Sequence, residues 1–113
     1  MQELTGPGAV ALAEAQAGQA TPLLLLDVRE PWEVALAAID LPGATTRSMP
    51  MREVPARLSE LDAAQPVLCF CHHGARSAQV VAFLERAGFT SAYNLAGGID
   101  AWSRDVDPGV PRY

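Results

Sequence analysis

The sequence has no lysine, so its eight basic residues are all arginines, and thirteen acidic residues outnumber them. The net charge of −5, without a basic cluster, argues against nucleic acid as a partner. Long apolar runs are also missing, since stretches such as residues 22–26 and 34–39 are far too short to span a bilayer. The first four residues do not show the basic-then-apolar pattern of a secretory signal. We therefore expect a soluble cytoplasmic protein with no membrane partner.

Cysteine is scarce, with only Cys69 and Cys71 present. Two residues apart in a strand, their side chains would share a face in poor geometry for a disulfide, so we expect two free thiols in a reducing compartment. Too few further ligands stand at a plausible spacing for a structural zinc site. We expect the protein to bind neither a metal nor a cofactor.

Half of the 113 residues are apolar, which is enough for one packed domain spanning residues 1–113. Apolar runs that suit strands alternate with stretches that suit helices. The expected strands cover residues 2–4, 22–28, 44–49, 67–70 and 92–95. The expected helices cover residues 7–17, 31–38, 55–61, 76–87 and 99–104. This alternation predicts an α/β fold with a parallel sheet and helices on both faces.

The most informative stretch is residues 71–77, Cys-His-His-Gly-Ala-Arg-Ser, between an apolar strand and the strongest predicted helix. In a strand–loop–helix unit, successive backbone N–H groups converge on the residue that follows the strand. That residue is Cys71, and the helix N-terminus together with Arg76 would lower the pKa of its thiol. We interpret Cys71 as a nucleophile held in an anion-binding loop. Cys69, two residues inside the strand, is expected to be an inert core residue.

The rest of this loop is expected to bind the substrate, through residues His72, His73, Gly74, Ala75, Arg76 and Ser77. Arg76 would either bind an anionic substrate or hold the loop in place. Ser77 would cap the helix or hydrogen-bond the thiolate. At the carboxyl end of a neighbouring strand, Asp27 and Arg29 either support this loop or form a surface ion pair. The two tryptophans are expected to be packing residues.

Four segments carry a resemblance to a known family. They are residues 26–33 (Leu-Asp-Val-Arg-Glu-Pro-Trp-Glu), 41–44 (Leu-Pro-Gly-Ala), 71–77, and 94–102 (Asn-Leu-Ala-Gly-Gly-Ile-Asp-Ala-Trp). In this order and spacing they resemble the signatures of the single-domain rhodanese, a sulfurtransferase, over nearly the whole chain. The resemblance implies a three-layer α/β/α sandwich with five parallel strands in the order 1-5-4-2-3. One departure is that Ile39 and Asp40 stand where members often carry Gly-His, which leaves the nucleophile untouched.

The resemblance also implies thiosulfate sulfurtransferase activity. The Cys71 thiolate would take the outer sulfur of thiosulfate or of a persulfide donor, and its persulfide would pass that sulfur to cyanide, a thiol or an acceptor protein. One alternative is a persulfide carrier with little thiosulfate activity. Another is a cysteine-dependent phosphatase or arsenate reductase, but phosphatase loops place arginine six residues after the cysteine, and Arg76 follows Cys71 by five. The physiological donor and acceptor and the oligomeric state do not follow from the sequence.

Overall fold

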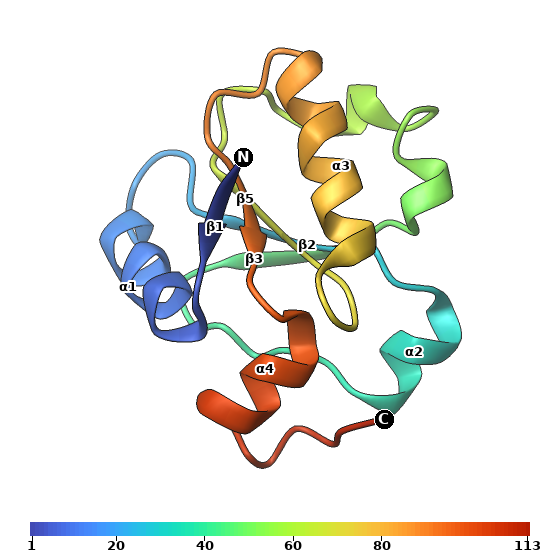
Figure 1. Ribbon diagram of the computed structural model, residues 1–113. Helices are drawn as coiled ribbons and strands as arrows, with labels where there is room; N and C mark the ends of the chain where they lie inside the picture. Colours follow the sequence, from blue (N-terminus) through green and yellow to red (C-terminus); the bar gives the residue numbers. More distant parts are fainter.

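Five parallel strands form the central sheet, in the order β1-β5-β4-β2-β3, in a computed structural model that describes residues 1–113 (Figure 1). The strands are β1 (Gln2–Leu4), β2 (Leu24–Asp27), β3 (Thr45–Ser48), β4 (Val67–Phe70) and β5 (Ala92–Leu95). Every residue of β2 and β4 is buried, which explains why both appear in the sequence as nearly continuous apolar runs. The strand order that the resemblance implied is confirmed, and all five strands lie within the predicted ranges.

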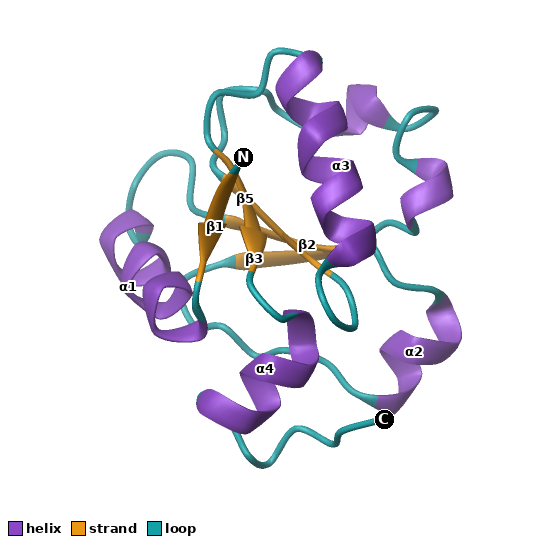
Figure 2. Ribbon diagram, in the orientation of Figure 1, coloured by secondary structure: helices purple, strands orange, loops and turns teal.

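Helices cover both faces of the sheet and complete a three-layer sandwich (Figure 2). They are α1 (Gly6–Gln16), α2 (Pro31–Leu36), α3 (Ala75–Arg86) and α4 (Gly98–Asp105). Ala13 of α1 and Ile99 of α4 belong to the apolar cluster on one face, and Val80 and Leu84 of α3 belong to the cluster on the other. Successive leucines of β2 alternate between the two clusters, as the two-residue period of a strand requires. None of these helices is long and apolar enough to cross a membrane.

The carboxyl ends of the two central strands lie side by side. β2 and β4 pair so that Asp27 is opposite Phe70, and Cys71 follows at once. The loop after β4 leads into α3, and the segment after β2 leads into α2. The sequence segments that carry the predicted site therefore meet at one edge of the sheet, as expected for a parallel α/β fold.

The helix predicted over residues 55–61 is wrong. The chain instead forms two short 3-10 turns, Met51–Glu53 and Leu58–Glu60. The N–H of Glu60 donates to the carbonyl of Arg57 and that of Leu61 to the carbonyl of Leu58, which is the three-residue spacing of a 3-10 turn. Val54 is the one buried residue between positions 51 and 60, so a longer helix would bury too little apolar surface to be stable.

The two tryptophans occupy different environments. Trp102 is buried, but Trp32 is 64% exposed, so the prediction that both are packing residues is wrong for Trp32. The reason is the position of α2, which buries only Glu33 and leaves its other side chains at the rim of the molecule.

Candidate active site

Cys71 lies directly after β4 and is only 1% exposed. Three hydrogen bonds converge on its Sγ atom, from the N–H of Gly74 (3.1 Å), the N–H of Ser77 (3.4 Å) and the Oγ of Ser77 (3.3 Å). Gly74 has a φ of +110°, a left-handed conformation that favours glycine. Because this turn leads straight into α3, N–H groups at the start of the helix are free to face the sulfur.

The presence or absence of hydrogen-bond donors gives the two buried cysteines different pKa values. Burial acts to raise the pKa of the Cys71 thiol, but the hydrogen bonds from Ser77, Gly74 and the N–H of Arg76 outweigh burial, so the pKa lies below its usual value. Burial without such donors raises the pKa of Cys69. Both cysteines are free, as predicted. Cys71 is thus the one that readily ionises, and Cys69 is a protonated core residue.

The first turn of α4 fixes the path of the cysteine loop. Gly98 has a φ of +62°, and a Cβ atom there would lie 2.4 Å from the carbonyl oxygen of His72 and 2.5 Å from that of Cys71. The N–H of Ile99 donates to the Cys71 oxygen at 2.9 Å, and the N–H of Asp100 donates to the His72 oxygen at 3.1 Å. The loop carbonyls are therefore occupied by α4, which leaves the loop N–H groups to face the sulfur.

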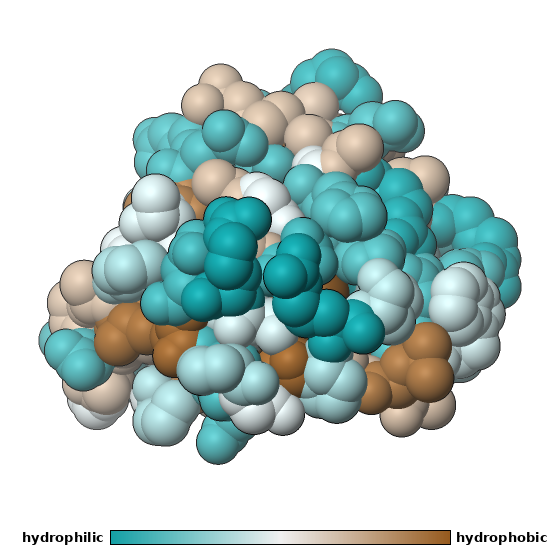
Figure 3. Space-filling view, turned by 60° about the horizontal axis from the view of Figure 1, so that its bottom comes forward, coloured by the Kyte–Doolittle hydropathy of each residue, from teal (hydrophilic) through white to brown (hydrophobic).

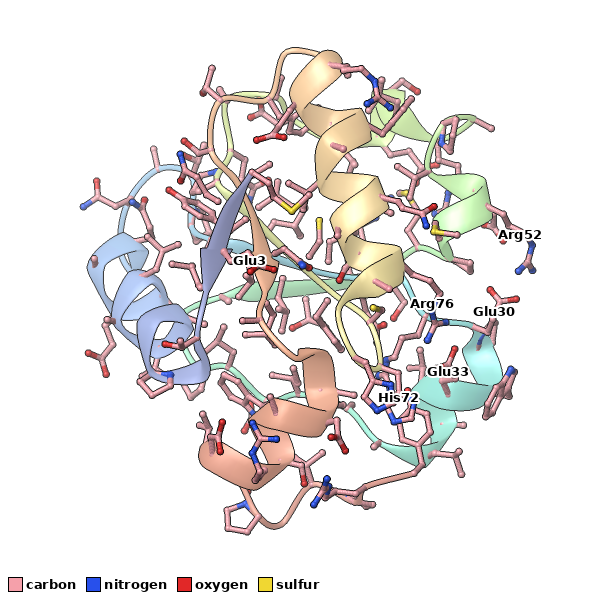
Figure 4. All side chains as sticks on the ribbon, in the orientation of Figure 1. Glu3, Glu30, Glu33, Arg52, His72 and Arg76 are labelled. Atoms are coloured by element: carbon pink, nitrogen blue, oxygen red, sulfur yellow. The ribbon has the colours of Figure 1, made fainter.

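Arg76 forms a two-point ion pair with Glu33 of α2 (Figure 4). Its Nη1 lies 2.6 Å from Oε1, and its Nη2 lies 2.8 Å from Oε2. The side chain of Glu33 is 4% exposed and that of Arg76 is 33% exposed. The hydrogen bonds from Arg76 lower the pKa of Glu33 to about 2, although burial acts in the opposite direction. The sequence left two roles open for Arg76, and the structure shows it tying α3 to α2.

Asp27 and Arg29 do not form the surface ion pair that was one of the two predictions for them. Arg29 is fully buried and donates from Nε and Nη2 to the Asp27 carboxylate, at 2.9 and 2.7 Å. It also donates to the backbone carbonyls of Glu33 and Ala37, at 3.3 and 2.7 Å. This pair fastens α2 to the end of β2, so Asp27 and Arg29 act on the cysteine loop indirectly, through the residues that Arg29 binds.

Tyr113, in the irregular C-terminal segment, joins this network. Its Oη donates to the Glu33 carboxylate at 2.8 Å and accepts from Arg29 at 3.2 Å. Its ring stacks on His72 with 3.9 Å between centroids, and His72 stacks on His73 at the same distance. Burial and the neighbouring His73 lower the pKa of His72, so its imidazole is mainly neutral at pH 7. The His72 ring therefore presents an uncharged surface beside the loop.

One group of side chains has ligand atoms close enough to hold a metal ion. These atoms belong to His72, His73 and Asp100 and lie within 4.8 Å of one another. Asp100, however, is already paired with Arg112, at 3.0 and 3.2 Å. The expectation that the protein binds no metal stays a prediction.

A second polar group supports the loop from β5. Asn94 accepts at Oδ1 from Ser77 Oγ (2.5 Å), and its Nδ2 donates to the carbonyl of Gly74 (3.2 Å) and to Glu3 of β1 (3.0 Å). Asn94 was missed as a site residue, although it opens the segment 94–102 that carried the resemblance. Glu33 was missed as well. A glutamate in the first turn of a helix that starts at Pro31 could have marked it as a candidate. No local pattern marked Tyr113.

The comparisons with known proteins agree with this geometry. The rhodanese-like domain family matches residues 9–105. A protein of Allochromatium vinosum named "Sulfurtransferase" is 42% identical over 88 residues, which make up 78% of this chain and 78% of that protein. A rhodanese-like/PpiC domain-containing protein of Arabidopsis thaliana is 41% identical over 93 residues, but the match spans only 30% of its length.

Among solved structures, the chain is similar to a rhodanese-related protein of Thermoplasma volcanium. The TM-score is 0.79 with 25% sequence identity, and the match covers 100% of both chains. The whole architecture described above, from the strand order to the flanking helices, is therefore a fold already known for this kind of domain.

Proposed function

The chain belongs to the family of rhodanese-like domains, and we propose that it is a sulfurtransferase that carries the transferred sulfur on Cys71. The observation that carries this proposal is the environment of the Cys71 sulfur, where three hydrogen bonds meet a buried thiol whose pKa is lowered. A thiolate is the nucleophilic form of cysteine, so this environment prepares the residue for attack.

In the first step, the Cys71 thiolate attacks the outer sulfur of a sulfane donor. With thiosulfate, the new Sγ–S bond forms while the S–S bond of the donor breaks, and sulfite leaves with the electron pair. Cys71 then carries a persulfide anion. The N–H groups of Gly74 and Ser77, which are aimed at Sγ, stabilise the negative charge as it moves to the outer sulfur.

In the second step, an acceptor attacks the outer sulfur and Cys71 leaves as a thiolate. Cyanide, a small thiol or a cysteine of an acceptor protein has the required nucleophilicity. We assign contact with donor and acceptor to the loop, residues His72, His73, Gly74, Ala75, Arg76 and Ser77. Arg76 takes part through its backbone N–H, because its guanidinium is bound to Glu33. Asp27 and Arg29 support the site indirectly, because they anchor α2 and thereby position Glu33.

The size of the loop supports sulfur transfer over phosphate chemistry. Arg76 is the fifth residue after Cys71, and both end nitrogens of its guanidinium are bound to Glu33. A tetrahedral oxyanion seated over the thiolate would need that guanidinium for itself. A sulfur atom needs only the N–H groups that already point at Sγ.

The proposal is tested by intact-mass measurement after incubation with thiosulfate or with a low-molecular-weight hydropersulfide. We expect a gain of one sulfur atom that dithiothreitol removes. The gain should be absent from Cys71→Ala and retained by Cys69→Ala, the matched control that removes the other thiol. Hydrolysis of a phosphomonoester with no sulfur uptake from either donor would overturn the proposal. Uptake from the hydropersulfide alone would favour a persulfide carrier.

A further inference from the structure

The arginines around the cysteine loop are all charge-compensated. Arg76 is paired with Glu33, Arg29 with Asp27, Arg52 with Glu30 and Arg112 with Asp100. Across the whole chain, seven of the eight arginines form such pairs, and the exception is Arg86 in the last turn of α3. The face that carries α2 and α4 is mainly hydrophilic (Figure 3). The four arginines around the loop nevertheless offer an approaching anion no unpaired guanidinium.

The contacts of Glu33 oppose release of the Arg76 guanidinium to an anionic sulfur donor. Both carboxylate oxygens are bound to the guanidinium, and Oε2 also accepts from Tyr113 while Oε1 accepts from the N–H of Glu30. Because Glu33 is buried, release of Arg76 towards a donor would leave a carboxylate without its cation in a poorly solvated position. Figure 4 shows the two side chains directed at one another from α2 and α3.

This arrangement matters because the nucleophile is itself an anion. Thiosulfate carries two negative charges and must approach the Cys71 thiolate closely, so the repulsion has to be offset by positive charge at the mouth of the loop. A hydropersulfide, R–S–SH, carries at most one negative charge on its sulfurs and can approach as a neutral molecule. His72, which is stacked between Tyr113 and His73, provides an uncharged surface for such a donor.

We propose that Glu33 determines donor specificity, because it occupies Arg76 and so makes the site select a hydropersulfide over dianionic thiosulfate. This inference rests on the proposed sulfur transfer through Cys71. In the selected reaction, Sγ of Cys71 bonds to the outer sulfur of R–S–SH as the S–S bond of the donor breaks. The electron pair leaves with R–S⁻, the proton stays on the transferred sulfur, and no oxidant or reductant is needed.

The test compares sulfur uptake by the wild type and by Glu33→Gln, a change that keeps the shape of the side chain and removes its charge. The rate of sulfur uptake at Cys71 is followed by intact mass with each donor in turn. Because the two donors differ in intrinsic reactivity, the informative quantity is the change in the thiosulfate-to-hydropersulfide rate ratio. We expect Glu33→Gln to raise this ratio about tenfold, through faster uptake from thiosulfate.

Glu60→Gln is the matched control, since it removes the same charge from an exposed glutamate whose partners are Arg47 and Arg57. This control should leave the ratio unchanged. A second measurement needs no variant of the site: millimolar sulfate, a dianion, should not protect wild-type Cys71 from alkylation by uncharged iodoacetamide when ionic strength is held constant with chloride.

The outcomes separate the inference from the function on which it rests. Sulfur uptake by Cys71 with the same donor ratio in wild type and a folded Glu33→Gln would overturn the role of Glu33 and leave the sulfurtransferase intact. Strong protection of wild-type Cys71 by sulfate would also overturn it, because sulfate would then have found a free cation. Absence of sulfur on Cys71 with both donors would overturn the proposed function itself.

Discussion

Replacement of Ser77 by alanine should raise the pKa of Cys71 by about one unit. The hydroxyl lies 3.3 Å from Sγ, and a hydrogen bond to a charged group is worth about 1.5–3 kcal/mol. The bond is long, and the single hydroxyl proton has two other acceptors, Asn94 and the carbonyl of Gly74, so the lower end of that range applies. A pKa unit corresponds to about 1.4 kcal/mol, which gives the predicted shift.

The assay is the rate of alkylation by iodoacetamide as a function of pH, because only the thiolate reacts. In the wild type the lowered pKa keeps the thiolate present below the usual range of a cysteine, and Ser77→Ala should move the whole profile towards alkaline pH. Both proteins are measured in a Cys69→Ala background, so that only Cys71 can react. An unchanged profile in a folded Ser77→Ala protein would refute the reasoning and assign the hydroxyl proton to Asn94.

Three further predictions concern the surrounding network. The pKa of Glu33 is about 2 in the folded protein against an ordinary 4.5, so its ion pair stabilises the fold above about pH 4.5. The free energy of unfolding should fall by about 3 kcal/mol between pH 4.5 and pH 2. Urea unfolding of Glu33→Gln should not show that loss. Gly98→Ala should lower the free energy of unfolding by about 3 kcal/mol, because the new Cβ would meet two loop carbonyls. Gly88→Ala is the control, since Gly88 has a φ of +100° but open space around it, and it should lower the same quantity by about 1 kcal/mol. Equal losses would contradict the clash at Gly98. Tyr113→Phe should lower the free energy of unfolding by about 1–2 kcal/mol and raise the pKa of Glu33, and no change in either quantity would contradict the hydrogen bonds of Oη.

The sheet was predictable because its strands are marked by local pattern. The continuous apolar runs of β2 and β4 reflect burial on both faces, and the polar segment Thr45–Ser48 reflects its place at an edge. The failure at residues 55–61 has the opposite cause. A few apolar side chains at helical spacing suggested an α-helix, but none of residues 55–61 is buried, so a helix there would gain too little from packing to be stable.

The placement of Cys71 was likewise predictable, since strand, loop and helix are neighbours in the sequence. The side chains that restrain the loop were harder to find, because they come from distant positions. Arg76 is 43 residues from Glu33, and Tyr113 is 80 residues from it. Such contacts depend on the path of the chain at the sheet edge, which periodicity and spacing do not encode. The sequence therefore left the role of Arg76 open between substrate binding and loop support.

The most direct test of a sulfur carried by Cys71 is a single-turnover experiment on the loaded protein. Wild-type protein is incubated with a sulfur donor, freed from that donor by gel filtration, and mixed with cyanide while thiocyanate and intact mass are followed together. We expect one thiocyanate per loaded chain, with the mass returning to that of the unmodified protein. Thiocyanate formation by Cys71→Ala, or a loaded protein that keeps its sulfur in the presence of cyanide, would contradict it.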